Sequence, residues 1–220
     1  MNEPAEITLE MARESLYSAV VSDALDGLGY THQSPRVQLP PLTGCSKLVG
    51  RCKTTLWAEM AHEDPNTYEL ELEAVDTCGP DGVMIAAAGG SMRSGIWGEL
   101  LTNATRNSGG VGAIVDGAIR DVAKITEMGF PVFGRGMSVY DSMNRCRVVN
   151  IDVVVEIDGV RFCPGDFVIA DVDGVVVVPR AVEGEALRAA WQKVHAENEV
   201  REAIKKGMGA REAWDTFGVL

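Results

Sequence analysis

The sequence has no long hydrophobic run, no closely paired cysteines and few basic residues. Its longest apolar runs, such as 83–88 and 175–178, are far shorter than the roughly 18 to 20 residues that span a bilayer, so we expect no membrane segment. The 5 cysteines form no CxxC pair, which argues against a disulfide framework or a cysteine zinc site. With 20 basic and 32 acidic residues, the formal net charge of −12 disfavours binding to nucleic acid.

The motifs of several common enzyme classes are also absent. No glycine-rich run leads into the lysine of a Walker phosphate loop. Gly110-Val111-Gly112 and Gly134-Arg135-Gly136 lack the third glycine of a dinucleotide fingerprint, because Val115 and Val139 stand in its place. The histidines form no HExxH motif and lie too far apart to suggest a catalytic triad: His32, His62 and His195. The N-terminus, residues 1–4, has no basic region of a secretion signal, so we expect a cytoplasmic protein.

The apolar spacing over the first 133 residues predicts alternating helices and buried strands. Two short apolar runs flanked by glycine, 83–88 and 111–115, are typical of strands buried on both faces. A further strand begins at Pro131, and helical spacing occurs over 9–25, 65–75, 96–107 and 120–128. This alternation favours a sheet with helical crossovers.

The remaining residues change in character. Turn signals at Asp158-Gly159, 164–166 and Asp173-Gly174 separate short strands and predict antiparallel hairpins. A long helix is expected from Glu183 to Lys206. We therefore predict one α/β domain over residues 1–180 and a C-terminal helical extension over 181–220 that serves oligomer contacts.

The stretch from Gly89 to Asp121 offers a candidate site. The glycine-rich loop 89–95 leads from a buried strand into a helix, whose free N–H groups suit an anion such as a carboxylate. Twenty residues lie between Glu99 and Arg120, and the intervening strand allows Glu99, Arg120 and Asp121 to share a crevice at the carboxyl ends of neighbouring strands. Arg120 suits a carboxylate and an adjacent keto oxygen, and Asp121 suits a hydrated Mg²⁺. The alternative is an ordinary tight turn and a surface ion pair.

These residues resemble the RraA-like family, which includes the 4-hydroxy-4-methyl-2-oxoglutarate/4-carboxy-4-hydroxy-2-oxoadipate aldolases. The resemblance covers roughly residues 10 to 180, and its most specific part is an acid, twenty intervening residues and then Arg-Asp. It implies an α-β-β-α sandwich resembling swivelling phosphohistidine domains, assembled as a homotrimer or homohexamer. The matching segments are 21–26, Gly89-Gly90, 98–101, 115–121, 131–133, 164–166 and 173–175.

The resemblance also implies an activity and the roles of individual residues. The backbone N–H groups of Gly98, Glu99, Leu100 and Leu101 would hold the pyruvyl carboxylate, Arg120 would bind substrate, and Asp121 would ligate a divalent cation, Mg²⁺ or Mn²⁺. The implied reaction is that of a class II pyruvate aldolase, in which the metal polarises the 2-keto group of a 4-hydroxy-2-oxo dicarboxylic acid and pyruvate is released. Decarboxylation of oxaloacetate passes through the same enolate. We expect Glu99 to position a water that protonates this enolate.

Some features leave alternatives open. Lys124 stands where many aldolase-active relatives carry an acid. In some relatives a C-terminal glutamate of a neighbouring subunit approaches the metal, and the choice between this role and a solvated helix face stays open for Glu197, Glu199 and Glu202. A rival function is that of RraA-type proteins that bind and inhibit RNase E without catalysis, which an acidic surface also suits.

Overall fold

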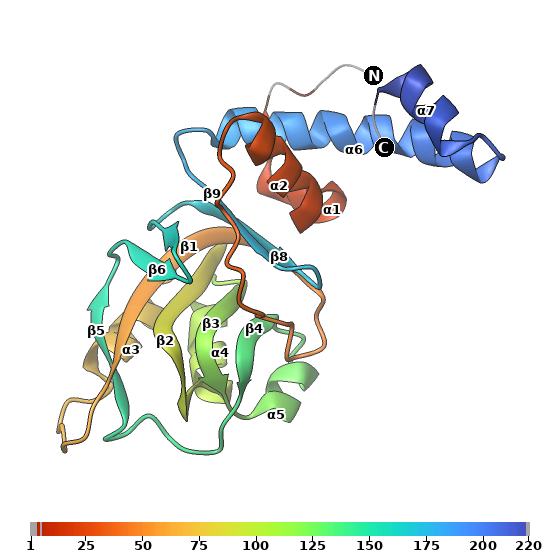
Figure 1. Cartoon of the computed structure of the whole chain (residues 1–220). Coiled ribbons are helices and arrows are strands. Elements are labelled where there is room, and N and C mark those ends of the chain that lie inside the picture. Colours follow the sequence, from red (N-terminus) through yellow and green to blue (C-terminus); the bar gives the residue numbers. More distant parts are fainter. Residues whose placement is uncertain (1–3, 5, 219–220) are drawn as a thin grey trace.

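The computed structural model describes residue 4 and residues 6–218, and a seven-stranded mixed sheet forms its centre (Figure 1). The strands are β1 (Lys47–Glu59), β2 (Gly82–Trp97), β3 (Gly112–Ile119), β4 (Val132–Met137), β5 (Cys146–Ile151), β6 (Val155–Ile157), β7 (Val160–Phe162), β8 (Phe167–Asp171) and β9 (Val175–Val178). The helices are α1 (Leu9–Ser15), α2 (Ser18–Gly27), α3 (Glu69–Asp76), α4 (Glu99–Asn107), α5 (Val122–Glu127), α6 (Glu183–Lys205) and α7 (Ala210–Phe217).

The order of strands in the sheet is β4-β3-β2-β1-β8-β9, and β5 pairs with β1 outside this path. Strands β1 to β4 pair in parallel, whereas β8, β9 and β5 join antiparallel. The helices α3, α4 and α5 are the crossovers between the parallel strands, as the alternation in the sequence predicts. The carboxyl ends of β2 and β3 therefore meet at one edge of the sheet.

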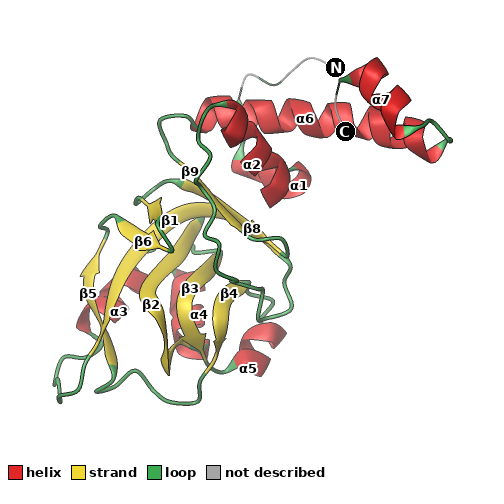
Figure 2. Ribbon diagram, viewed as in Figure 1, coloured by secondary structure: helices red, strands yellow, loops and turns green. Residues whose placement is uncertain are grey.

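Each face of the sheet is covered by a different layer (Figure 2). Alternate residues of β2 serve the two faces, so Val83 and Ile85 belong to one core and Met84 and Ala86 to another. On the first face the sheet packs against the β6–β7 hairpin. On the second face α3, α4 and α5 cover the parallel strands, and α1, α2 and α6 cover β8 and β9. The predicted α/β sandwich with a C-terminal helical extension is confirmed.

The helix predicted over residues 9–25 is wrong in one respect, because the chain forms two helices there. Leu16 and Tyr17 are extended between α1 and α2. The buried carboxylate of Asp171 accepts hydrogen bonds from the backbone N–H of Ser18 at 2.7 Å and from its hydroxyl at 2.6 Å. The Asp171 carboxylate thus provides an acceptor for the N–H of Ser18 at the start of α2. This offsets the helical hydrogen bonds lost where the helix is interrupted.

The prediction of a loop over the glycine-rich segment 89–95 is wrong. This segment is part of the 16-residue strand β2. Gly89 and Gly90 have positive φ of 60° and 75°, so β2 bends while its pairing with β3 continues through register shifts. As a result α4 begins at Glu99 rather than at residue 96. Asp116 and Gly117 lie within strand β3, where buried Asp116 pairs with Arg135.

The C-terminal helices lie at one end of the molecule. The first half of α6 packs on α2 and the sheet through Ala186, Leu187 and Ala190. Figure 1 shows the second half running past the sheet, with α7 folded against its far end. Within residue 4 and residues 6–218, no helix is both long enough and apolar enough to cross a membrane.

The parallel strands approach one another too closely for a side chain at Gly50. A Cβ at this position would lie 2.3 Å from the carbonyl oxygen of Asp81, which accepts the N–H of Arg51 at 2.8 Å. We expect Gly50→Ala to lower the free energy of unfolding by about 2 kcal/mol, because backbone must move to admit the methyl group. Urea denaturation followed by circular dichroism measures this change. Gly184→Ala, with nothing within 4 Å of the new Cβ, serves as the control. Equal stability of the two variants would contradict the prediction.

Candidate active site

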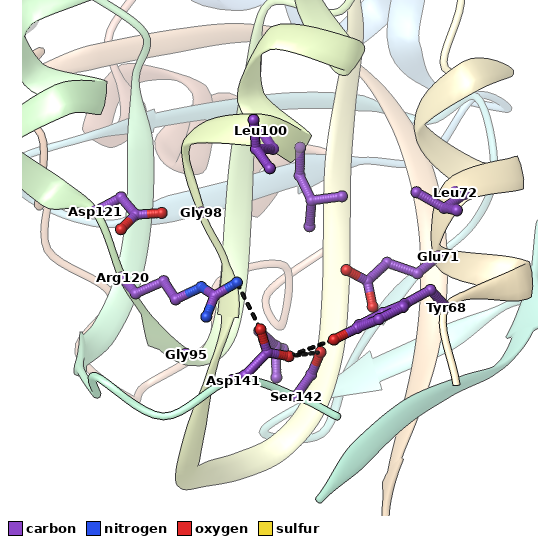
Figure 3. Close-up of a pocket in the computed structure, with 12 residues that line it drawn as sticks. Tyr68, Glu71, Leu72, Gly95, Gly98, Leu100, Arg120, Asp121, Asp141 and Ser142 are labelled. Carbon is purple, nitrogen blue, oxygen red and sulfur yellow. Dashed lines mark hydrogen bonds and ion pairs between the residues drawn. The ribbon is translucent and has the colours of Figure 1, made fainter. Parts of the chain in front are cut away.

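A cavity of about 290 Å³ lies at the carboxyl ends of β2 and β3 (Figure 3). Four segments of the chain supply its walls: α3, the end of β2 with the start of α4, the β3–α5 turn, and the loop after β4. The lining residues are Tyr68, Glu71, Leu72, Gly95, Ile96, Gly98, Leu100, Leu101, Arg120, Asp121, Asp141 and Ser142. The cavity therefore joins parts of the sequence that are up to 74 positions apart, from Tyr68 to Ser142.

Backbone hydrogen bonds hold three of these segments together. The N–H of Arg120 donates to the carbonyl of Trp97 at 2.8 Å, and the N–H of Ser138 donates to the carbonyl of Ile119 at 3.0 Å. The N–H of Gly95 donates to the carbonyl of Tyr140 at 2.9 Å. The position of Arg120 is thus set by main-chain contacts rather than by a flexible surface loop.

Two glycines permit this close approach. A Cβ at Gly95 would lie 2.5 Å from the carbonyl oxygen of Ser138 and 2.9 Å from Cβ of Arg120. A Cβ at Gly98 would lie 2.9 Å from Oδ2 of Asp121 and 3.3 Å from Nε of Arg120. Gly95 is therefore required for the close backbone approach to Ser138, whereas Gly98 leaves room for the side chain of Asp121.

The backbone of Asp121 takes a conformation that few residues adopt. Its φ of 57° and ψ of 28° are left-handed, in the position just before α5. Aspartate tolerates this region better than most residues, but the conformation still carries strain, which proteins commonly keep at functional sites. The turn brings the Asp121 carboxylate to the start of α4, where Oδ2 accepts the N–H of Glu99 at 3.2 Å.

Arg120 is paired within the cavity. Its Nη2 lies 2.9 Å from Oδ2 of Asp141, whose Oδ1 accepts the hydroxyl of Tyr68 at 2.6 Å and the N–H of Met143 at 2.8 Å. Partial burial raises the pKa of Asp141, but these hydrogen bonds and the charge of Arg120 outweigh it, so the pKa lies below its usual value. Burial and the hydrogen bond to Asp141 raise the pKa of Tyr68 to about 12. At neutral pH Asp141 is therefore ionised and Tyr68 is neutral.

Glu71 is the most deeply buried carboxyl group of the cavity. It is only 6% exposed, and its Oε2 has no hydrogen-bond partner among the described residues. Burial, reinforced by the negative charge of Asp141 and opposed by Arg120, raises the pKa of Glu71 to about 8. Two carboxyl groups of one cavity thus differ in protonation at neutral pH.

The structure brings together most of the residues singled out in the sequence. Gly98, Leu100, Leu101, Arg120 and Asp121 all line the cavity. Glu99 starts α4 beside them and contributes its N–H to Asp121, but its carboxylate accepts the side-chain amide of Asn103 at 2.5 Å, one turn along the helix. The carboxylate of Glu99 is not among the groups that line the cavity in the described chain.

The sequence alone did not point to Tyr68, Glu71, Asp141 or Ser142. Asp141 and Ser142 lie in a loop without a recognisable pattern, so no local signal marks them. Glu71 carries a usable signal, because it shares the buried face of α3 with Ala74 and Val75, where a charged side chain is unusual.

Two of the three C-terminal glutamates have partners within this chain, and Glu199 is exposed. Glu197 accepts the hydroxyl of Tyr17 at 2.5 Å, and Glu202 lies 2.9 Å from Nζ of Lys205. They lie on α6, a helix that supplies none of the described residues lining the cavity. A role at the site of a neighbouring subunit stays a prediction, as does the effect of Lys124, which is exposed on α5.

Comparisons with known proteins agree with this architecture. A family model described as "RraA-like: Aldolase/RraA" matches residues 18–177. A protein of Halalkalibacterium halodurans named "Putative 4-hydroxy-4-methyl-2-oxoglutarate aldolase" is 32% identical over 198 residues, which cover 90% of this chain and 89% of the relative. Among solved structures, a protein of Pseudomonas syringae pv. tomato superposes with a TM-score of 0.82 at 26% identity, over 93% of this chain and 95% of that one.

A second solved structure is that of RraAS2 from Streptomyces coelicolor, titled an unusual member of the RNase ES inhibitor RraA protein family. It superposes with a TM-score of 0.77 at 28% identity, over 91% of this chain and 98% of that one. The match over residues 18–177, together with a sheet and cavity built from those same residues, shows that the chain belongs to the RraA-like family.

Proposed function

We propose that this protein is a divalent-metal-dependent class II pyruvate aldolase. It cleaves a 4-hydroxy-2-oxo dicarboxylic acid, of the 4-hydroxy-4-methyl-2-oxoglutarate or 4-carboxy-4-hydroxy-2-oxoadipate type, to pyruvate and a second keto acid. It also decarboxylates oxaloacetate, because both reactions leave the enolate of pyruvate. The name of the Halalkalibacterium relative supports this class of reaction.

One observation carries the proposal. Arg120 and Asp121 stand side by side at the carboxyl end of β3, beside the first turn of α4, and line one cavity together with it. A permanent cation, a hard oxygen ligand and free helix N–H groups are the groups that a 2-oxo acid requires at its carboxylate and keto oxygens. Surface ion pairs and ordinary turns do not need all three in one cavity.

The substrate carboxylate would lie at the first turn of α4. The N–H groups of Leu100 and Leu101 have no partner within the helix, because the first turn of any helix leaves such donors free. The positive end of the helix dipole adds to this attraction. Arg120 uses one nitrogen for Asp141, and its guanidinium has further donors for the same carboxylate or the keto oxygen.

The donor set fits a hydrated hard cation rather than a closed protein cage. Among the described residues no cluster of three or more His, Cys, Asp or Glu side chains is placed to hold a metal. Asp121 offers a carboxylate at the cavity wall whose Oδ1 accepts no hydrogen bond from the described chain. One carboxylate, waters and a chelating substrate suit Mg²⁺ or Mn²⁺. When bound, the cation would act as a Lewis acid on the 2-keto oxygen.

The oligomeric state belongs to the same proposal. The cavity is rimmed by exposed apolar side chains, among them Leu72 and Leu100, at 52% and 76% exposure. Apolar rims of this kind are covered when subunits associate. We propose a homotrimer or homohexamer with the cavity near a subunit contact.

A second function has one specific observation in its favour. The Streptomyces structure, which shares this fold, is titled a member of an RNase ES inhibitor family. An acidic protein that binds a ribonuclease would need neither a free cation nor a cavity with Arg120 and Asp121. The assay below therefore separates the two functions.

We expect the protein to release pyruvate from oxaloacetate and from 4-hydroxy-4-methyl-2-oxoglutarate with Mg²⁺ or Mn²⁺, and to lose this activity in EDTA. Arg120→Ala and Asp121→Ala are each expected to lower kcat by about 100-fold or more, because each removes an electrostatic contact to the reacting oxygens. A coupled lactate dehydrogenase assay measures pyruvate.

Arg211 and Asp215 form an ion pair on α7, outside the cavity. Arg211→Ala and Asp215→Ala are therefore matched controls, because they remove the same types of side chain elsewhere. EDTA-resistant turnover, or full turnover in Asp121→Ala, would contradict the metal site. The absence of pyruvate from both acids, together with binding to RNase E, would favour the inhibitor function.

Gly98→Ala is expected to damage the site without unfolding the protein. The new Cβ meets Oδ2 of Asp121 at 2.9 Å, and this carboxylate is able to swing away, whereas no backbone needs to move. We expect a thermal midpoint close to that of the wild type and pyruvate release reduced by about 10- to 100-fold, because Asp121 is displaced. Differential scanning fluorimetry measures the thermal midpoint, and the pyruvate assay measures turnover. A large fall in stability, or unchanged turnover, would contradict this account.

For Glu99 we keep a role in proton transfer, in which its carboxylate positions a water beside Arg120. This role requires the carboxylate to leave Asn103, to which it is bonded in this structure. Glu99→Ala is expected to lower kcat by about 10-fold or more and to leave KM nearly unchanged, because substrate is held by the helix N–H groups. Steady-state kinetics on both acids give the two constants. Full turnover in Glu99→Ala, alongside an inactive Arg120→Ala, would refute the role.

A further inference from the structure

Glu71 is a buried carboxyl group that the family resemblance does not assign. It extends from α3 into the cavity, and Figure 3 shows its carboxyl group pointing into the space that separates α3 from the Arg120–Asp141 pair. Behind it lie Trp57 and Trp97, in an apolar space between α3 and the sheet. Glu71 therefore has an apolar wall on one side and the cavity on the other.

The charged groups around Glu71 do not neutralise it. The positive charge of Arg120 acts on Glu71, but this guanidinium is paired with Asp141, whose negative charge also acts on Glu71. The hydroxyl of Tyr68, the residue just before α3, donates to Asp141 instead. Oε2 of Glu71 is left without a hydrogen bond from the described residues, although it is buried.

This arrangement is unfavourable for stability. A buried polar atom without a partner is unfavourable, and an apolar residue in the same place would avoid that cost. Burial together with Asp141 raises the pKa of Glu71 to about 8, so the group holds its proton at neutral pH. A protonated carboxyl group in a reaction cavity is a typical general acid.

We propose that Glu71 is the general acid that delivers a proton to C3 of the pyruvate enolate. The proposal rests on the proposed function, and it makes Glu71 the direct proton donor, while a water held by Glu99 would return the proton to Glu71 after each turnover. Glu71 is favoured because its carboxyl group lines the cavity, whereas the carboxylate of Glu99 is bonded to Asn103.

The proton balance is the same at C3 in both reactions. In oxaloacetate the bond between C3 and the C4 carboxylate breaks, carbon dioxide leaves, and the electron pair stays on the enolate. The proton of Glu71 then forms the new C–H bond at C3, giving pyruvate, and the ionised Glu71 regains a proton from solvent. In the aldol cleavage the C3–C4 bond breaks as the 4-hydroxyl group loses its proton to water, and Glu71 again protonates C3.

The test compares the pH profiles of kcat for wild type, Glu71→Gln and Glu73→Gln on both acids, with the uncatalysed decarboxylation subtracted. Glu73 is the matched control, because it is an exposed glutamate two residues along the same helix. We expect wild-type kcat to fall above about pH 8 as Glu71 ionises. Glu71→Gln is expected to have a kcat about 100-fold lower that does not fall further above pH 8, with little change in KM. Glu73→Gln is expected to behave like wild type.

Thermal unfolding provides a readout independent of turnover. The pKa of Glu71 is about 8 in the folded protein against 4.5 for the free side chain, so the folded state binds more protons between these values and its stability falls as pH rises through them. Glu71→Gln, which has no charge to bury, should therefore be more stable than wild type at pH 9, and this advantage should disappear near pH 5.

The possible results are distinguishable. If the wild type is active and Glu71→Gln has a normal kcat that still falls above about pH 8, the role of Glu71 is overturned. The aldolase function then still stands. A variant that loses stability at every pH, or only raises KM, identifies a purely structural residue and also overturns the proposal. An inactive wild type on both acids overturns the proposed function and, with it, this role.

Discussion

The candidate site depends on the close approach of two chain segments, the end of β2 and the end of β3. The backbone around Gly95 leaves no room for a side chain between the segments, and the N–H of Arg120 donates to the carbonyl of Trp97. This contact places the guanidinium and the Asp121 carboxylate beside the first turn of α4. The sheet beneath supplies rigidity, because β3 is buried along its whole length. Precise placement of reactive groups therefore follows from backbone packing.

The charges of the cavity form a second level of organisation. Asp141 is held ionised by Tyr68, a backbone N–H and Arg120, although burial acts against it, whereas Glu71 has no such donors and keeps its proton. The difference between the two carboxyl groups arises from their surroundings, since the side chains are chemically alike. Environments that separate two pKa values in this way are a common basis for acid and base roles in one cavity. The ion pair with Asp141 also orients the guanidinium of Arg120.

The fold does not by itself decide the function, because relatives with this architecture carry different names. One is named as an aldolase and another is titled a member of a ribonuclease inhibitor family. What favours catalysis in this chain is the combination of Arg120, Asp121 and the free N–H groups of α4 in one cavity. An argument from these side chains is stronger than an argument from the fold.

The sequence by itself determined the α/β class, the buried strands and the long C-terminal helix, because apolar periodicity is a local property. It also determined that Arg120 and Asp121 lie near the start of α4, since the Arg-Asp pair and the preceding acid form a recognisable motif. Tertiary structure decided where the helices begin. Asp171 separates α1 from α2, and pairing with β3 keeps residues 89–97 in a strand. It also decided the chemistry of Glu71, because the pKa of a carboxyl group depends on burial and on distant residues such as Asp141, which no local pattern reveals.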